Sequence, residues 1–220
     1  RPGPHDPNPA KGKWITPPIG PTIGSPTGSP IGNLIMFLQF DLFSPYSDRL
    51  IHGITTRELG SFNGSETGYE NQLEKLEEVV GLRPAFPIQI HSDIILKIED
   101  FPKIRPEADT YLTQSKNLPI GVKSADCQGV LFFDPVQNAI AATHSGWRGS
   151  AQNIIGKTVQ RMVTEFGSNP NDLIVGIGPS IGPCCLEFTH PEKELPAPMH
   201  PYIKDRKLDF WSLSLDQLKE

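Results

Sequence analysis

Short apolar runs alternate with two longer amphipathic segments along most of this chain. The runs are rich in β-branched and aromatic residues and are bounded by Asp, Asn, Pro or Gly, which is the pattern of β-strands. The predicted strands are residues 34–42, 87–90, 118–122, 130–133, 139–143 and 173–177. Together with the two amphipathic segments, they predict an α+β fold.

The two amphipathic segments place apolar residues at helical spacing. Residues 69–80 end before Gly81, and residues 151–166 end before Gly167. A glycine directly after the last apolar position is typical of a helix C-terminus, because glycine readily adopts a left-handed conformation. The sequence therefore predicts two helices that each bury one face.

Two of the predicted strands form a candidate hairpin around Asp134-Pro135. Cys127 lies just before the first strand, and His144 follows the second. Antiparallel pairing around such a turn brings these two ends together. The sequence thus predicts that Cys127 and His144 are neighbours, whereas no comparable local argument places His91.

His91, Cys127 and His144 each stand at the end of an apolar run. One thiolate and two imidazoles form a ligand set that suits Zn²⁺, and three protein ligands leave a fourth position open, as in catalytic zinc sites. A buried cysteine that packs as a small apolar residue, beside two structural histidines, is the simpler alternative.

Four further residues are candidates for substrate binding. Arg57 and Arg148 would each hold an oxyanion such as phosphate, and Arg148 directly precedes a predicted helix. Asp126 would orient a histidine or cap a turn. Gln89 lies two residues before His91, so on a strand its amide would share a face with His91 and read a base edge, or pack structurally.

The length and composition indicate one domain. A chain of 220 residues with 37% apolar content is long enough for one substantial core, which we assign to residues 34–220. Residues 1–33 contain nine Pro and six Gly, and such a composition does not bury enough apolar surface to offset the entropy of ordering. We expect them to form a disordered arm, either native or a tag.

The charge, the apolar runs and the cysteines of the chain each exclude one class of partner or environment. The net charge of −5 argues against nucleic acid, because phosphate backbones recruit stripes of Lys and Arg. The apolar stretch at residues 34–43 is half the ~20 residues that span a bilayer, so no membrane association is expected. Three cysteines, of which the adjacent Cys184 and Cys185 are not expected to bridge each other, argue against a disulfide scaffold and indicate a reducing cytoplasm.

Five sequence blocks, in order, resemble the signature blocks of the YfiH-like laccase-domain family. They are Thr55-Thr56-Arg57, Gln89-Ile90-His91, Ala125-Asp126-Cys127, His144-Ser145-Gly146-Trp147-Arg148-Gly149 and residues 178–187. The resemblance implies a layered α/β/β/α sandwich with mixed sheets. It also implies a zinc-dependent purine nucleoside phosphorylase that deaminates adenosine and cleaves methylthioadenosine, with purine nucleosides and phosphate as substrates.

Two features depart from the family pattern. The family's Arg-x-Gly-Gly sequence is Arg57-Glu58-Leu59-Gly60 here, which weakens the assignment of Arg57. The chain also ends just after a segment, residues 209–218, that resembles the family's penultimate helix. We therefore expect a domain that lacks the family's final strands and has an exposed sheet edge.

Other classes of function remain open. Cys127 as a nucleophile with His144 as its base would give a metal-free amidase or deamidase. A copper-dependent polyphenol oxidase is disfavoured because only six histidines are present and none forms a His-x-His pair, although Cu²⁺ would compete for the same ligands. A non-catalytic binding protein with a degenerate pocket is the last alternative, and the sequence indicates no oligomeric state.

Overall fold

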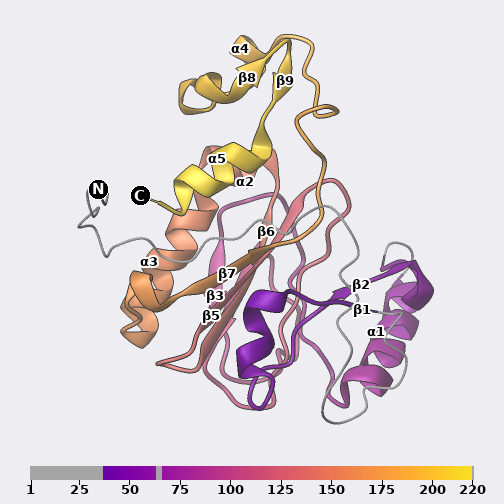
Figure 1. Ribbon diagram of the computed structural model, residues 1–220. Helices are drawn as coiled ribbons and strands as arrows, with labels where there is room; N and C mark the ends of the chain where they lie inside the picture. The colour runs from indigo at the N-terminus through magenta and orange to yellow at the C-terminus, as the bar shows by residue number, and fades with distance from the viewer. Residues whose placement is uncertain (1–36, 63–65, 220) are drawn as a thin grey trace, which may run out of the picture.

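A five-stranded mixed sheet forms the centre of the protein (Figure 1). The computed structural model describes residues 37–62 and 66–219, so the arm predicted for residues 1–33 lies outside the described residues. The strand order is β3 (Ile95–Lys97), β4 (Thr110–Thr113), β6 (Ala139–Ser145), β5 (Gln128–Asp134) and β7 (Ile174–Ile177). Strands β3 and β4 are parallel, and the other pairs are antiparallel.

The predicted hairpin is confirmed as β5 and β6. Its turn begins at Asp134, whose Oδ1 accepts hydrogen bonds from the backbone N–H groups of Val136 and Gln137 at 2.8 and 2.9 Å. Gly129 pairs with His144 across the hairpin. The chain segment that carries Cys127 therefore enters the sheet directly beside His144.

The helix predicted for residues 151–166 is α3 (Ile154–Phe166), which begins three residues later, and a separate short helix, α2 (Trp147–Ala151), precedes it. They are separated at Asn153, whose backbone has a left-handed φ of 56° and whose side chain accepts a hydrogen bond from the Gly156 N–H at 3.0 Å. Asparagine tolerates this conformation and is a favourable N-cap, so it starts a new helix. The predicted end at Gly167, with φ of 70°, is confirmed.

The larger core lies between α3 and the sheet. Its buried members come mainly from α3, β4, β5, β6 and β7, and include Ile154, Ile155, Met162, Leu112, Phe132 and Val175. The apolar face that the sequence predicted for this helix is therefore the face that covers the sheet. A separate apolar cluster packs Phe133 of β5 against Phe40 and Phe43 of the N-terminal segment.

Helix α1 (Glu66–Val80) contains the predicted residues 69–80 and ends at Gly81, which has a φ of 79°. It buries Tyr69, Leu73 and Leu76 against Phe86 in a cluster of its own. In Figure 1, α1 and α3 lie on the two sides of the sheet strands. The short 3-10 helix η3 (Arg57–Leu59) packs against α1.

Among the described residues, two predicted strands are absent and a third is shorter than predicted. Within residues 34–42 the described strand is only β1 (Phe37–Leu38), which pairs with β2 (Ile54–Thr55) before the 3-10 helix η2 (Asp41–Tyr46) begins. Residues 87–90 and 118–122 each form a single bridge rather than a ladder. Both contain a proline, which has no N–H to donate to a ladder. The sequence analysis also missed β3 and β4.

The C-terminal part forms a small unit beside the sheet. It comprises α4 (Pro191–Glu194), the 3-10 helix η5 (Ala197–Tyr202), β8 (Ile203–Lys204), β9 (Lys207–Leu208) and α5 (Phe210–Gln217), and follows the 3-10 helix η4 (Pro170–Asp172) and β7. Helix α5 ties this unit to the central fold, since the Gln217 side chain donates to the Ser150 carbonyl at 2.6 Å and Ser214 donates to Gln128 at 2.5 Å.

These elements form a mixed α/β single domain with a mixed sheet, as the sequence predicted. Within residues 37–62 and 66–219, no helix combines the length and the apolar character needed to cross a membrane.

Candidate metal centre

The structure brings His91, Cys127 and His144 together. Their candidate ligand atoms all lie within 4.8 Å of one another, and the two imidazole rings meet edge to face with centroids 4.8 Å apart. His144 is buried on β6, Cys127 is half-buried before β5, and His91 is exposed in a loop. The cluster therefore has one side that small molecules can reach.

Gly146 leaves the space that the three side chains occupy. A Cβ at this position would lie 3.0 Å from His91 Cδ2 and 3.1 Å from Cys127 Sγ. Contacts this short are tighter than ordinary van der Waals contacts, so any larger residue would push the candidate ligands apart. The backbone at Gly146 has a φ of −82°, which any residue can adopt. Glycine is therefore favoured here by the space that the neighbouring side chains need, and not by the backbone conformation.

The carboxylate that holds the cluster belongs to Asp109, a residue that the sequence analysis missed. Its side chain is completely buried, and its Oδ1 lies 2.7 Å from His144 Nδ1. This contact leaves Nε2 of His144 to act as the ligand atom when Nδ1 carries the proton. Asp109 therefore sets the tautomer and the orientation of His144.

Asp109 also fixes the loop that carries His91. Its carboxylate accepts hydrogen bonds from the backbone N–H groups of Ile90, His91 and Ser92 at 3.3, 3.1 and 2.6 Å, and from the Ser92 hydroxyl at 2.7 Å. His91 adopts a left-handed φ of 60° within this loop. One buried carboxylate thus positions both imidazoles.

The hydrogen bonds of the cluster determine its electrostatics. Burial alone raises the pKa of Asp109, but the hydrogen bonds from His144 and Ser92 outweigh burial and lower this pKa. For His144 burial lowers the pKa, and the hydrogen bonds to Asp109 and Cys127 raise it to about 9. Burial and the neighbouring His144 lower the pKa of His91. Without a metal, His144 therefore carries a proton at neutral pH, which a metal must displace.

Arg148 is exposed in the first turn of α2, with its guanidinium carbon 4.4 Å from the centre of the Trp147 ring. Its charge contributes to the lowered pKa of His91, so it lies near the cluster. Arg57 is exposed at the start of η3. Among the contacts of the described residues, none connects Arg57 with the three candidate ligands.

Gln89 and Asp126 flank the cluster in sequence. The Gln89 amide donates to the Lys123 carbonyl at 2.7 Å and accepts from the Lys123 N–H at 2.6 Å, so both of its polar ends are engaged with this backbone. The side chain of Asp126 is exposed, and its backbone carbonyl accepts from the Ile181 N–H at 2.9 Å. The carboxylate that contacts His144 is that of Asp109 rather than Asp126.

His52 has a structural role and makes its contacts with the N-terminal segment. Its Nε2 accepts a hydrogen bond from the Phe40 N–H at 2.9 Å, and its ring contacts Phe43 edge to face with centroids 4.8 Å apart. An imidazole that accepts at Nε2 in an apolar setting is neutral. Burial accordingly lowers the pKa of His52 to about 4.

The chain belongs to the family described as multi-copper polyphenol oxidoreductase laccase, whose sequence model matches residues 59–220. Curated relatives bear the name purine nucleoside phosphorylase. One from Clostridium acetobutylicum is 38% identical over 156 residues, and YfiH of Escherichia coli is 30% identical over 132 residues. The predicted membership of the YfiH-like laccase-domain family is confirmed.

These alignments leave part of each relative unmatched. They cover 69% of this chain and 63% of the Clostridium protein, and 59% of this chain and 53% of the Escherichia coli protein. The chain therefore spans less than two thirds of the length of these relatives.

Solved structures support the same fold. The crystal structure of Bacillus licheniformis YfiH matches with a TM-score of 0.58 and 27% identity, over 70% of this chain and 66% of that chain. The structure of a Neisseria meningitidis DUF152 protein matches with a TM-score of 0.59 and 27% identity, over 73% and 69% of the two chains.

Proposed function

We propose that residues 34–220 form a zinc-dependent purine nucleoside enzyme. Its reaction is the phosphorolysis of adenosine, inosine, guanosine and methylthioadenosine, together with deamination of adenosine. The observation that carries the proposal is the grouping of His91, Cys127 and His144 within 4.8 Å. It is supported by relatives that are named purine nucleoside phosphorylases.

The residues of the cluster fit a zinc ion in two respects. One thiolate and two imidazoles are preferred zinc ligands, and three of them leave a position for substrate or water. The space between the side chains depends on the missing side chain of Gly146. When bound, zinc supplies a Lewis acid that polarises water or a substrate atom.

The surrounding residues orient the ligands and the phosphate. Asp109 holds the proton of His144 on Nδ1, which presents Nε2 to the metal. Arg148 is the proposed phosphate ligand, because its exposed guanidinium lies near His91 and binds oxyanions through two N–H groups. Arg57, Gln89 and Asp126 are proposed to complete the substrate site, with Gln89 also holding the Lys123 segment.

Metal content tests the proposal directly. The purified protein and a Cys127→Ala variant, prepared identically, would be analysed by elemental mass spectrometry. We expect about one zinc per chain in the parent and none in the variant, with nucleoside cleavage that requires phosphate only in the parent. Absence of metal from both proteins would contradict the zinc mechanism.

A metal-free amidase or deamidase is the second candidate function. It is favoured by the hydrogen bond between His144 and Cys127, which helps to raise the pKa of His144. A protonated imidazole beside a thiol stabilises the thiolate, as in cysteine hydrolases. Iodoacetamide separates the two functions: a metal-bound thiolate is shielded, whereas a catalytic thiolate reacts quickly and is not protected by added zinc.

The metal analysis and the activity assays also test two other functions, a copper-dependent oxidase and a non-catalytic binding protein. Cu²⁺ binds nitrogen and sulfur ligands more tightly than Zn²⁺, so copper in the isolated protein together with phenol oxidation would favour an oxidase. Bound metal without any turnover would favour a binding protein. The proposed compartment is the cytoplasm, because Cys127, Cys184 and Cys185 are all free thiols.

A further inference from the structure

Cys184 and Cys185 are neighbours in the chain, and their side chains face each other. Their Sγ atoms lie 2.7 Å apart, and both residues are exposed. This separation is about 0.7 Å longer than a disulfide bond. The two thiols therefore stand close to bonding distance while both are accessible from solvent.

The backbone around the two thiols is fixed on both sides. The N–H groups of Cys185 and Leu186 both donate to the Gly182 carbonyl, at 2.9 and 3.2 Å, which forms a tight turn. Leu186 continues into contact with β9 by accepting from the Leu208 N–H at 2.9 Å. The short distance between the sulfur atoms is thus a property of a defined turn.

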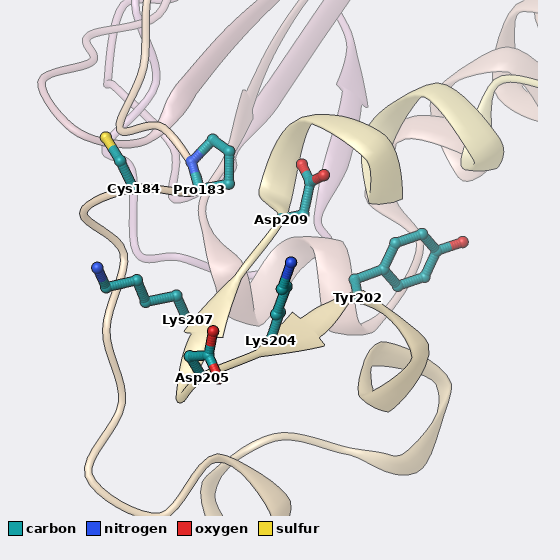
Figure 2. A pocket seen from close by; sticks show the side chains of 7 residues that line it. All are labelled: Pro183, Cys184, Tyr202, Lys204, Asp205, Lys207 and Asp209. Carbon is teal, nitrogen blue, oxygen red and sulfur yellow. The ribbon is translucent and has the colours of Figure 1, made fainter.

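Cys184 is one of the residues that line a pocket of about 240 Å³. Figure 2 shows Cys184 and Pro183 on one side of this pocket and the β8–β9 hairpin on the other. The hairpin contributes Lys204, Asp205 and Lys207, and Asp209 follows it. The thiolate is the reactive form of a cysteine toward peroxide.

The second thiol retains its proton. The hydrogen bond with Cys184 raises the pKa of Cys185, and burial adds to this increase although the charge of Lys207 opposes it. Either sulfur can donate in this contact, and Cys184 is the one of the two that lines the pocket. An accessible sulfur beside a second thiol is the arrangement of redox-sensing cysteines.

We propose that Cys184 and Cys185 form a reversible redox site that hydrogen peroxide oxidises to a disulfide between the two neighbours. The Cys184 thiolate attacks one peroxide oxygen, the O–O bond breaks, and hydroxide leaves, which gives a sulfenic acid on Cys184. The Cys185 sulfur then attacks the Cys184 sulfur, the S–O bond breaks, and the S–S bond forms. Two thiols and one peroxide thus yield one disulfide and two waters.

The disulfide is expected to be reduced easily. The Cα atoms of residues joined by a trans peptide are about 3.8 Å apart, and the described residues contain no cis peptide bond. Ordinary disulfides join Cα atoms about 4.4 to 6.8 Å apart, and bonds outside this range are strained and more reducible. Both cysteines are free thiols in the structure, and the proposal departs from the sequence prediction that they do not bridge each other.

The same loop reaches the candidate metal centre. Ile181 donates its N–H to the carbonyl of Asp126, the neighbour of Cys127, at 2.9 Å. Ser180 in this loop accepts from the Trp211 indole N–H at 2.9 Å. The redox site is thus separated from Cys127 by one hydrogen-bonded loop.

Peptide mass spectrometry tests the redox site in the full chain. The reduced protein is treated with hydrogen peroxide, denatured, alkylated with iodoacetamide and digested. We expect the peptide that contains Cys184 and Cys185 to lose two hydrogen atoms and to take up no alkyl group. Treatment with dithiothreitol before alkylation should restore two alkyl groups.

Single substitutions identify the two roles. In Cys185→Ser the second step is blocked, so a sulfenic acid on Cys184 should accumulate and react with dimedone. Cys184→Ser should show no loss of two hydrogens. Cys127→Ser is the matched control, and its Cys184–Cys185 peptide should still lose two hydrogens, which excludes Cys127 as the second thiol.

Three results would overturn the redox site. One is a parent peptide that still takes up two alkyl groups at a peroxide dose that oxidises Cys127. Another is oxidation of the pair directly to sulfinic or sulfonic acid without a disulfide. The last is a disulfide between two chains, seen as a dimer on a non-reducing gel.

Discussion

Asp109 Oδ1 lies 2.7 Å from His144 Nδ1, and both side chains are buried. The same carboxylate accepts hydrogen bonds from the backbone of the His91 loop. A single buried residue therefore orients two of the three candidate metal ligands. Asp109 is therefore a positioning residue. Its removal should weaken metal binding, because it orients the ligands and does not itself contact the substrate.

Asp109→Asn should lower zinc affinity about 10- to 100-fold, as is typical when the partner of a metal-bound histidine is changed. The neutral amide no longer stabilises the Nδ1–H tautomer of His144. Affinity would be measured by competition with a chromophoric chelator. Asp126→Asn is the matched control, since the Asp126 side chain is exposed. Equal losses in the two variants would argue against a specific role of Asp109.

Gly146→Ala should reduce metal content, because the added Cβ would lie about 3 Å from His91 and Cys127. The backbone at this position accepts alanine without strain, so thermal stability of the metal-free protein should change little. Elemental analysis measures the metal content, and a thermal melt of the metal-free protein measures the stability.

Gly129→Ala is the control for Gly146→Ala, since its Cβ would meet neighbours only at 3.5 Å or more. It should retain the metal. A Gly146→Ala protein with a full complement of zinc would show that the cluster has room that the structure does not indicate.

His52 should make the protein less stable in acid. The pKa of His52 is about 4 in the folded protein, against 6.5 for an unperturbed histidine, so between these values the unfolded chain binds a proton that the folded chain does not. The free energy of unfolding is therefore independent of His52 above pH 6.5 and falls as the pH decreases toward 4, by up to about 3 kcal/mol. Urea denaturation at several pH values measures this slope.

His52→Gln is the matched variant for the acid effect. Its amide oxygen can still accept from the Phe40 N–H, but it does not titrate. The slope of stability between pH 6.5 and pH 4 should therefore be smaller than in the parent. If the free energy of unfolding fell equally with decreasing pH in both proteins, groups other than His52 would be responsible for the acid sensitivity.

Asn153→Ala should lower the free energy of unfolding by about 1 to 2 kcal/mol. It removes the hydrogen bond from the Gly156 N–H and places alanine, which lacks the polar side chain that lets asparagine adopt this conformation, at a left-handed φ of 56°. Asn153→Gly also loses the cap but accepts this backbone freely, so its cost should be only a few tenths of a kcal/mol. Urea denaturation measures the free energy of unfolding of both variants. A greater loss of stability in Asn153→Gly than in Asn153→Ala would contradict this prediction.

Local patterns in the sequence were sufficient for several parts of the fold. Apolar periodicity and a terminal glycine predicted α1 and the end of α3, since these signals depend on residues within one or two turns. The hairpin of β5 and β6 was predicted for the same reason. The predicted hairpin also implied that Cys127 and His144 lie close together.

Other parts of the fold were misjudged because local signals conflicted. Residues 87–90 and 118–122 are apolar but contain Pro87 and Pro119, which prevent a regular ladder. The helix predicted from residue 151 begins only at Ile154, because the side chain of Asn153 caps it there. In each case a single polar group or imino acid outweighed a run of apolar residues.

The sequence by itself thus determined the residue types of the candidate metal centre, the hairpin that joins Cys127 to His144, and the family. Only the tertiary structure decided how His91 and Asp109 reach that hairpin. Thr110 of β4 pairs with Thr143 of β6, and this register places Asp109 beside His144. Pairing between strands so distant in the chain depends on packing of the whole sheet, so it leaves no local pattern in the sequence.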